Sequence, residues 1–266
     1  MYKLIAIDMD GTLLKEDKTI SEYTKKIIEQ ARKIGVKIVL ASGRPLEGLE
    51  AYLDMLGLVS EEDYVICYNG AIVQNVATKE VVGRTVLTGI DLKKLYEVSK
   101  ELEVSIHAFS KEGCITPIMT KYSQLEGDIN DIPVKVMDYS QVTDEEEIIK
   151  IMLVDEPKVL QKAVDRLPKK LYSEYTVVRS APYFLEFLDK KVNKGEGVRA
   201  LAEHLNIKKE EIMCFGDAGN DWHMIEFAGM GVAMGNAFPE VKEIANYITK
   251  TNEEDGVAYA IEKFVL

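Results

Sequence analysis

Cysteine and histidine are scarce in this sequence. Its 266 residues include three of each, and neither type shows the spacing of a metal site. Cys67 and Cys214 lie within apolar runs, where a free cysteine usually packs as a small hydrophobic residue. The sequence therefore predicts no metal centre built from thiolates or imidazoles.

Long apolar runs are also missing. A helix that spans a membrane needs roughly 18 or more consecutive apolar residues, and no stretch approaches that length. The N-terminus carries only the short run Leu4–Ile7, without the cleavage pattern of a signal peptide. We expect a cytoplasmic protein that does not bind membranes.

Positive charge is in deficit. The chain has 33 lysines and arginines against 45 aspartates and glutamates, which gives a net charge of −12 and a pI near 4.9. This balance argues against binding to nucleic acid or to an anionic membrane surface. A small anionic substrate remains compatible with it, because local cations and helix N-termini can attract an anion into a pocket.

The order of strand and helix signals predicts an α/β fold. Strands and helices alternate over the first part of the chain and again after the middle, as in βαβ units on a parallel sheet. Ser21 and Asp255 are the expected N-caps of two of the helices. The first group of expected elements comprises strands at 3–8, 36–41 and 65–68 and helices at 21–34 and 45–56; the last comprises helices at 194–205 and 256–264 and strands at 212–215 and 232–234.

The middle of the chain does not show the regular strand–helix alternation of its two ends. Helical signals at 92–102 and 159–167 are mixed with strand signals at 104–109, 149–154, 175–178 and 184–188. We interpret this block as an α+β cap inserted into a Rossmann-like three-layer core. The predicted core covers 1–83 and 190–266, the predicted cap covers 84–189, and hinges are expected near 82–84 and 188–193.

Two carboxylates follow the first predicted strand directly. Asp8 and Asp10 come after Leu4–Ile7, and residues two apart in an extended chain point to the same side. Gly11 then allows a sharp turn. Two carboxylates in one pocket repel each other unless a cation or a shared proton intervenes, and a hard cation such as Mg²⁺ prefers oxygen ligands. The pair predicts a Mg²⁺ site in which one aspartate is a nucleophile and the other moves protons.

Three further polar loops lie at the ends of later elements. Ser42 and Gly43 follow the second strand, where a hydroxyl and main-chain amides can hold phosphate oxygens. Lys194 stands at the start of a helix, and Gly216–Asp221 follows another strand. Because ligands bind at the C-terminal ends of strands in open α/β sheets, these loops predict one phosphate-binding site. The candidate groups of the last loop are Asp217, Asn220 and Asp221.

Two stretches match other motifs in part. Asp-x-Asp-Gly also begins a calcium-binding EF-hand loop, but the twelfth position from Asp8 is Thr19 instead of the bidentate glutamate. Gly229–Gly231 looks like part of a dinucleotide fingerprint, yet its third glycine would fall on Met234. Neither motif is predicted.

Each candidate residue, taken singly, also has an ordinary structural explanation. Ser42 could cap the following helix, and Lys194 could be an exposed lysine. Asp217 and Asp221 could be turn and N-cap residues. Arg44 is either a group near the substrate or the partner of a core carboxylate, and the sequence leaves both interpretations open.

Together, the four loops resemble the motifs of the haloacid dehalogenase (HAD) superfamily of aspartate-nucleophile phosphatases. The order of aspartate, serine, lysine and paired acids matches, and the inserted block resembles the C2B cap of the Cof-type subgroup. Trp222 and His223 depart from the pattern, since smaller or aliphatic residues are more usual there, and their roles stay open. A closer similarity, to YidA-type sugar phosphatases, is carried by Tyr68–Ala71, Ser180–Glu186, Asp189–Gly195, Gly231–Met234 and Glu254–Ala258.

The resemblance implies a role for each candidate residue. Asp8 attacks phosphorus to form an aspartyl-phosphate, and Asp10 protonates the leaving alcohol and then activates water. Mg²⁺ is implied at the Asp8 carboxylate, the Asp10 carbonyl and Asp217, with Asp221 behind them. The implied phosphate-binding groups are the amides of Met9 and Gly43 and the side chains of Ser42, Lys194 and Asn220, while Arg44 and Asn69 are expected near the substrate.

The predicted function is a Mg²⁺-dependent phosphatase acting on small phosphorylated metabolites, most of all sugar phosphates. Cap side chains are expected to set specificity. One alternative is a phosphomutase or other phosphotransferase that uses the same aspartyl-phosphate. Another is a noncatalytic protein that binds a phosphorylated metabolite. The sequence does not indicate an oligomeric state.

Overall fold

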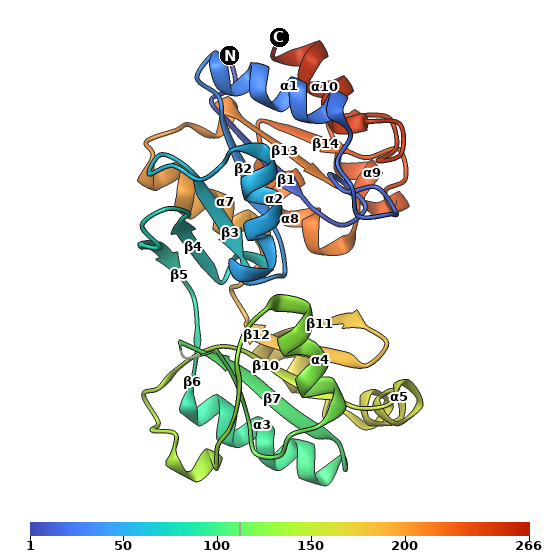
Figure 1. The fold of residues 1–266 in the computed structure, drawn as a ribbon. Coiled ribbons are helices and arrows are strands. Elements are labelled where there is room, and N and C mark those ends of the chain that lie inside the picture. Colours follow the sequence, from blue (N-terminus) through green and yellow to red (C-terminus); the bar gives the residue numbers. More distant parts are fainter. Residues whose placement is uncertain (112) are drawn as a thin grey trace. The chain divides into compact units, whose positions relative to one another are not determined.

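The computed structural model describes residues 1–111 and 113–266. These residues form two compact units, one made of Met1–Arg84 with Asn193–Leu266 and the other of Thr85–Val192 (Figure 1). We call them the core unit and the cap unit. The second crossing lies three residues later than expected (192 against 189). The reason is that Val192 N–H donates to the Asp189 carbonyl at 2.9 Å, which keeps this turn with the cap unit.

A mostly parallel sheet forms the centre of the core unit. Its strand order is β15-β14-β13-β1-β2-β3-β4-β5; the pairs from β15 to β3 are parallel, whereas β4 and β5 are added as antiparallel strands. Every residue of β1 is buried, as expected for a strand covered on both faces. The predicted α/β class with a parallel central sheet is confirmed. The strands are β1 (Leu4–Asp8), β2 (Lys37–Ala41), β3 (Tyr64–Cys67), β4 (Ile72–Asn75), β5 (Val81–Arg84), β13 (Ile212–Gly216), β14 (Met230–Ala233) and β15 (Tyr247–Ile248).

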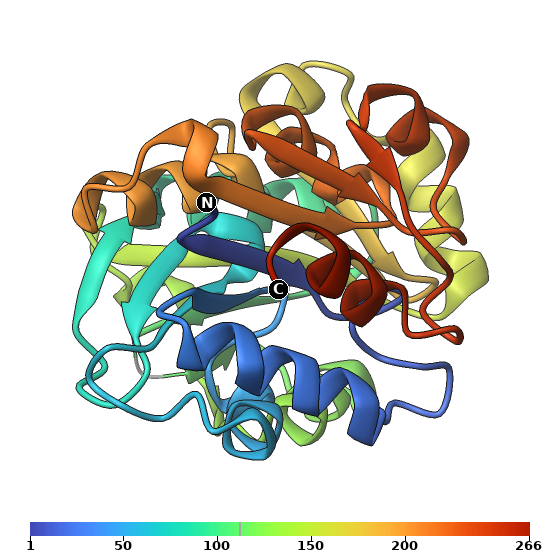
Figure 2. The same ribbon diagram turned by 90° about the horizontal axis from the view of Figure 1, so that it is seen from above.

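Helices cover both faces of this sheet. Figure 2 shows α1 and α10 on one face and α7 and α8 on the other, so the core unit has three layers. The core helices are α1 (Glu22–Lys33), α2 (Glu50–Leu56), α7 (Lys194–His204), α8 (Trp222–Phe227), α9 (Pro239–Ile244) and α10 (Gly256–Phe264), with 3₁₀ turns η1 (Glu47–Leu49), η2 (Tyr68–Gly70), η4 (Lys209–Glu211) and η5 (Gly219–Asp221).

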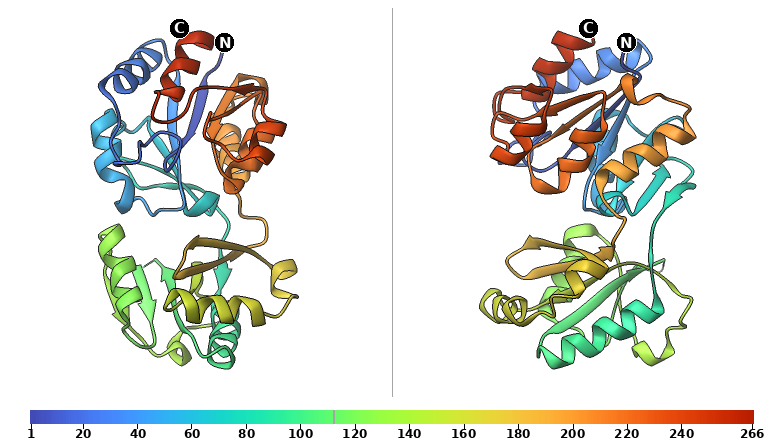
Figure 3. Two further views of the ribbon diagram at one scale, coloured as in Figure 1. Left: turned by 90° about the vertical axis from the view of Figure 1, so that its right-hand side faces the viewer. Right: turned by 180° about the vertical axis from the view of Figure 1, so that it is seen from behind.

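The cap unit is built on a second, largely antiparallel sheet. Its strand order is β11-β12-β10-β7-β8-β9, with β6 paired to β10. Helices lie on both sides of this sheet (Figure 3). The elements are β6 (Leu87–Thr88), β7 (Ser105–Ser110), β8 (Gly113–Thr116), β9 (Val134–Val136), β10 (Glu147–Val154), β11 (Tyr175–Ala181), β12 (Phe184–Asp189), α3 (Gly89–Glu101), α4 (Lys121–Asn130), α5 (Pro157–Arg166), α6 (Leu171–Glu174) and η3 (Tyr139–Gln141).

The two faces of the cap sheet differ in polarity, because alternate residues of a strand point to opposite sides. On β10, Ile151 and Leu153 belong to an apolar cluster that includes residues of α3 and α5. Lys150, one position away, is buried and lies 3.3 Å from Glu126 of α4 and 3.6 Å from Glu186 of β12. Helix α4 therefore covers the polar face through buried charges.

The two expected N-caps have different outcomes. Ser21 accepts a hydrogen bond from Thr24 N–H at 3.0 Å and caps α1 as predicted. Asp255 precedes α10, but its φ is 57° and its side chain makes no capping bond; its carboxylate instead accepts from the Thr24 hydroxyl at 3.2 Å. Tertiary contact with α1 thus replaces local capping at α10.

No helix in the described part of the chain is long and apolar enough to cross a membrane.

The buried His107 makes the stability of the cap unit depend on pH. Burial, and after it the charge of Lys150, lower the pKa of His107 to about 3. The unfolded chain therefore takes up the imidazole proton first as pH falls, and stability is lost between about pH 6.5 and pH 3. We expect this residue to remove about 2 kcal/mol of stability between pH 7.5 and pH 5. Urea unfolding of His107→Gln should lack that component, whereas the exposed His223→Gln should keep it. Equal pH slopes for wild type and His107→Gln would contradict the assignment.

Candidate active site

The predicted site loops meet at one edge of the core sheet. Asp8 ends β1, Ser42 follows β2, and Asp217 follows β13. These three strands are neighbours and parallel, in the order β13-β1-β2. Their C-terminal ends therefore lie side by side, as the sequence predicted for a ligand site in an α/β sheet.

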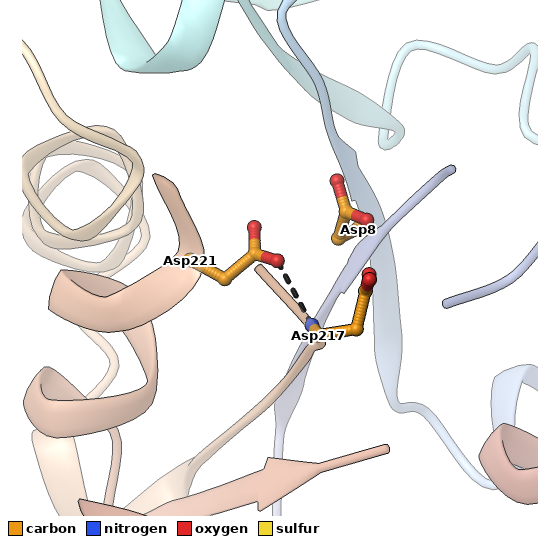
Figure 4. A group of neighbouring side chains, drawn as sticks. All are labelled: Asp8, Asp217 and Asp221. Atoms are coloured by element: carbon orange, nitrogen blue, oxygen red, sulfur yellow. Dashed lines mark hydrogen bonds between the residues drawn. The ribbon is translucent and has the colours of Figure 1, made fainter. Parts of the chain in front are cut away.

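Three aspartates gather at this edge. Oxygens of Asp8, Asp217 and Asp221 lie within 4.8 Å of one another, and Figure 4 shows their side chains together. Asp221 Oδ2 accepts hydrogen bonds from the amides of Asp217 at 2.9 Å and Ala218 at 3.0 Å. Asp221 is thus a fully buried support that shapes the loop, and the carboxylates of Asp8 and Asp217 lie beside it.

Lys194 lies at the centre of this group. It is the first residue of α7 and is 0% exposed, which rules out the alternative of an ordinary surface lysine. Its Nζ donates to Asp8 Oδ1 and, at 2.6 Å, to Asp221 Oδ1. Burial alone would lower the pKa of Lys194, but the charges of Asp221 and Asp8 raise it above its usual value. The ammonium group therefore stays charged.

The aspartates carry more negative charge than one lysine can neutralise. Burial, and after it the charge of Asp221, raise the pKa of Asp8 to about 8. Burial likewise raises the pKa of Asp217. Neighbouring carboxylates in a desolvated site are stabilised by a cation, and Mg²⁺ takes oxygen ligands of this kind. The donor set therefore fits Mg²⁺.

The loop of the first motif approaches Asp217 very closely. Gly11 has a φ of +85°, and a Cβ atom there would lie 2.5 Å from Asp217 Oδ2. Any other residue would displace the carboxylate. Thr12, next in the chain, donates its hydroxyl hydrogen to Asp217 Oδ1 at 2.8 Å. No role was predicted for Thr12, although its place directly after the Asp-x-Asp-Gly run was a usable signal.

Asp10 engages a different set of cations from Asp8. Its carboxylate accepts from Lys18 at 2.7 Å and from Arg44 at 2.9 Å. Burial would raise the pKa of Asp10, but these two cations lower it below its usual value. Arg44 therefore pairs with a half-exposed carboxylate of the candidate site and not with a buried core carboxylate, and its expected place near the substrate stays a prediction. No sequence signal pointed to Lys18, because its loop has no regular pattern.

The remaining candidates come from several loops at the ends of the core strands. Ser42 is buried, and its hydroxyl accepts from Arg44 N–H at 3.2 Å. Asn220 donates to the side chain of Asn69 at 3.2 Å. Met9, between the two aspartates of the first motif, is fully buried, so its side chain belongs to the core.

Trp222 and His223 lie outside this group. They begin α8, and their rings are 5.3 Å apart in an edge-to-face arrangement. The His223 main chain packs against Gly195 of α7, where a Cβ atom would lie 2.6 Å from the His223 carbonyl oxygen. The unusual pair therefore packs beside α7, the helix that carries Lys194.

Comparison with known proteins finds similarity over nearly the whole chain. A family model described as haloacid dehalogenase-like hydrolase matches residues 5–261. The chain is 46% identical to the putative phosphatase YxeH of Bacillus subtilis (strain 168), over 100% of this chain and 99% of the relative. It is 33% identical to 5-amino-6-(5-phospho-D-ribitylamino)uracil phosphatase YitU of the same organism, over 98% and 97%. A solved structure of the HAD subclass IIB sugar phosphatase BT4131 superposes with a TM-score of 0.79 at 26% identity, covering 98% of each chain.

Replacing Asp221 tests its role as a buried support. In Asp221→Asn the amide offers one acceptor oxygen to the N–H groups of Asp217 and Ala218 and to Lys194, so buried donors are left unpaired. We expect a loss of about 1–3 kcal/mol in the free energy of unfolding, measured with urea and a metal chelator present. Asp10→Asn is the control, because Asp10 is about half exposed and its ion pairs should contribute under about 1 kcal/mol. Equal stabilities for the two variants would contradict this role.

Proposed function

The chain belongs to the haloacid dehalogenase-like hydrolase family, and on this premise we propose that it is a Mg²⁺-dependent phosphatase that hydrolyses small phosphomonoesters, chiefly sugar phosphates, with Asp8 as nucleophile. The observation that carries the proposal is the buried contact of Lys194 with both Asp8 and Asp221, beside Asp217. A buried lysine between carboxylates places a fixed positive charge where a phosphate dianion and an attacking carboxylate would meet.

The charges of the site suit attack on a phosphate. A carboxylate and a phosphate oxygen 4 Å apart repel each other by about 4 kcal/mol at an effective dielectric near 20. Lys194 opposes this repulsion with a charge that is already in place, which needs no rearrangement during the reaction. Asp8, Asp217 and the carbonyl of Asp10 would hold Mg²⁺, which adds charge neutralisation at the same oxygens.

We assign two displacement steps to these residues, as the family resemblance implies. An Asp8 oxygen forms a bond to phosphorus while the bond to the leaving alcohol breaks, and Asp10 gives that alcohol its proton. Asp10 then takes a proton from a water molecule that attacks phosphorus, so that inorganic phosphate leaves and Asp8 is restored. Ser42, the Met9 and Gly43 amides, Lys194 and Asn220 are assigned to the phosphate oxygens.

The sugar-phosphate class rests on similarity. One relative is named as a sugar phosphatase and another as a phosphatase of a phosphorylated ribitylaminouracil. Both names describe a phosphate ester on a polyhydroxylated carbon chain. We assign the choice among such leaving groups to side chains of the cap unit.

Turnover of a metabolite panel tests the reaction class. We expect phosphate release from several sugar monophosphates and from a generic aryl phosphate in the presence of Mg²⁺. A chelator should stop turnover, and added Mg²⁺ should restore it. Isomer exchange of a sugar phosphate without phosphate release would instead identify a phosphomutase. Binding without any turnover would identify a noncatalytic phospho-metabolite protein.

Asp8→Asn tests the nucleophile. The amide cannot attack phosphorus, so phosphate release should fall below a few per cent of wild type. The free energy of unfolding should not decrease, because the substitution removes a buried carboxylate that Asp221 repels while Lys194 keeps Asp221 as its partner. Activity above a few per cent in a correctly folded variant would exclude Asp8 as nucleophile.

A further inference from the structure

The turn after β3 has an unusual backbone. Tyr68, Asn69 and Gly70 have φ values of 51°, 56° and 100°, so three successive residues adopt left-handed or related conformations. Two of them are not glycine, and asparagine tolerates this region better than tyrosine does. Strain of this kind persists only where the surrounding structure holds the chain in place, and it is often found at functional sites.

Main-chain hydrogen bonds tie this turn to the loop after β2. Tyr68 N–H donates to the Arg44 carbonyl at 3.1 Å, and Asn69 N–H donates to the Ser42 carbonyl at 2.8 Å. The left-handed turn therefore fixes the main chain of the loop whose hydroxyl and amides are assigned to phosphate.

The side chain of Asn69 joins two of the assigned loops. Its Oδ1 accepts from Asn220 Nδ2 at 3.2 Å. On the other side, Asn69 Nδ2 lies against Gly43, where a Cβ atom would be 3.1 Å away. Asn69 is only 7% exposed and its Oδ1 is engaged by Asn220. Its contacts are therefore with phosphate-binding loops and not with solvent.

Gly70 brings the same turn against the start of α7. A Cβ atom at this position would lie 2.2 Å from the Asn193 carbonyl oxygen and 3.3 Å from Lys194 Cα. The turn and the first residues of α7 thus pack main chain to main chain. This contact constrains where the main chain of Lys194 lies relative to the turn.

We propose that Tyr68–Gly70 is a positioning element for phosphate binding, and that Asn69 is its positioning residue. The turn fixes the relative positions of three groups from separate parts of the chain, namely the Ser42–Gly43 loop, Asn220 and Lys194. This role rests on the proposed function, because it takes those three groups as the phosphate ligands. In this proposal Asn69 acts on the phosphate through its neighbours, whereas the sequence predicted a place near the substrate.

Asn69→Gly separates positioning from folding. Glycine accepts the positive φ without strain, so the urea midpoint should equal or exceed that of wild type. The carboxamide that links Gly43 to Asn220 is lost, and a misplacement of the order of 1 Å lowers catalysis by about 10- to 100-fold. We expect kcat to fall by this factor with a smaller rise in KM, and the affinity for orthovanadate with Mg²⁺, measured by calorimetry, to weaken about tenfold or more.

Asn75→Ala is the matched control. Asn75 is also a buried asparagine and is the last residue of β4; its side chain donates to the Glu61 carbonyl at 2.7 Å and accepts from the amides of Ala77 and Thr78. Its loss should lower the free energy of unfolding while kcat and orthovanadate affinity stay within twofold of wild type. The two variants should therefore show opposite patterns.

The outcomes keep this proposal distinct from the proposed function. If Asn69→Gly retains kcat and orthovanadate affinity within twofold of wild type, the positioning role is wrong and the phosphatase assignment stands. If wild type releases no phosphate but binds orthovanadate or inorganic phosphate, the phosphatase assignment fails, and weaker binding by Asn69→Gly still supports positioning. If wild type binds neither oxyanion, both proposals are overturned.

Discussion

The buried Lys194 is the interaction on which the rest of the site depends. A lysine with no exposed surface needs carboxylate partners, and Asp8 and Asp221 supply them from two other loops. Asp221 also accepts hydrogen bonds from the amides of Asp217 and Ala218 in its own loop. One ammonium group therefore joins β1, α7 and the loop after β13, and Lys194 would be costly to bury without a carboxylate partner.

The neighbouring contacts extend this arrangement without adding to its charge. Gly11 and Thr12 bring the first loop against Asp217, and the Tyr68–Gly70 turn connects the loop after β2 with α7. Asp10 lies apart, with Lys18 and Arg44 as its partners. The two aspartates of the first motif thus have different surroundings: burial and Asp221 raise the pKa of Asp8, whereas Lys18 and Arg44 lower the pKa of Asp10.

Sequence patterns predicted the elements whose signals are local and strong. The apolar strands β1, β2, β3 and β13 and the periodic helices α1, α7 and α10 were found within a few residues, and the superfamily is confirmed by the family match. The strands β4 and β5 and the helix α4 were missed. Strand β5 (Val81–Arg84) is short and half exposed, and helix α4 buries charged and polar residues. These two elements therefore lack the apolar pattern on which sequence-based prediction relies.

By itself, the sequence determined that Asp8, Ser42, Lys194 and Asp217 stand at strand ends and at a helix start, because these features are encoded locally. Only the tertiary structure decided what these side chains do to each other. Burial makes Lys194 a shared cation, Asp221 a support and Asn69 a link between loops, and each of these roles is set by groups from distant parts of the chain. The physical reason is that desolvation and charge pairing depend on distance in space, which local sequence patterns do not encode.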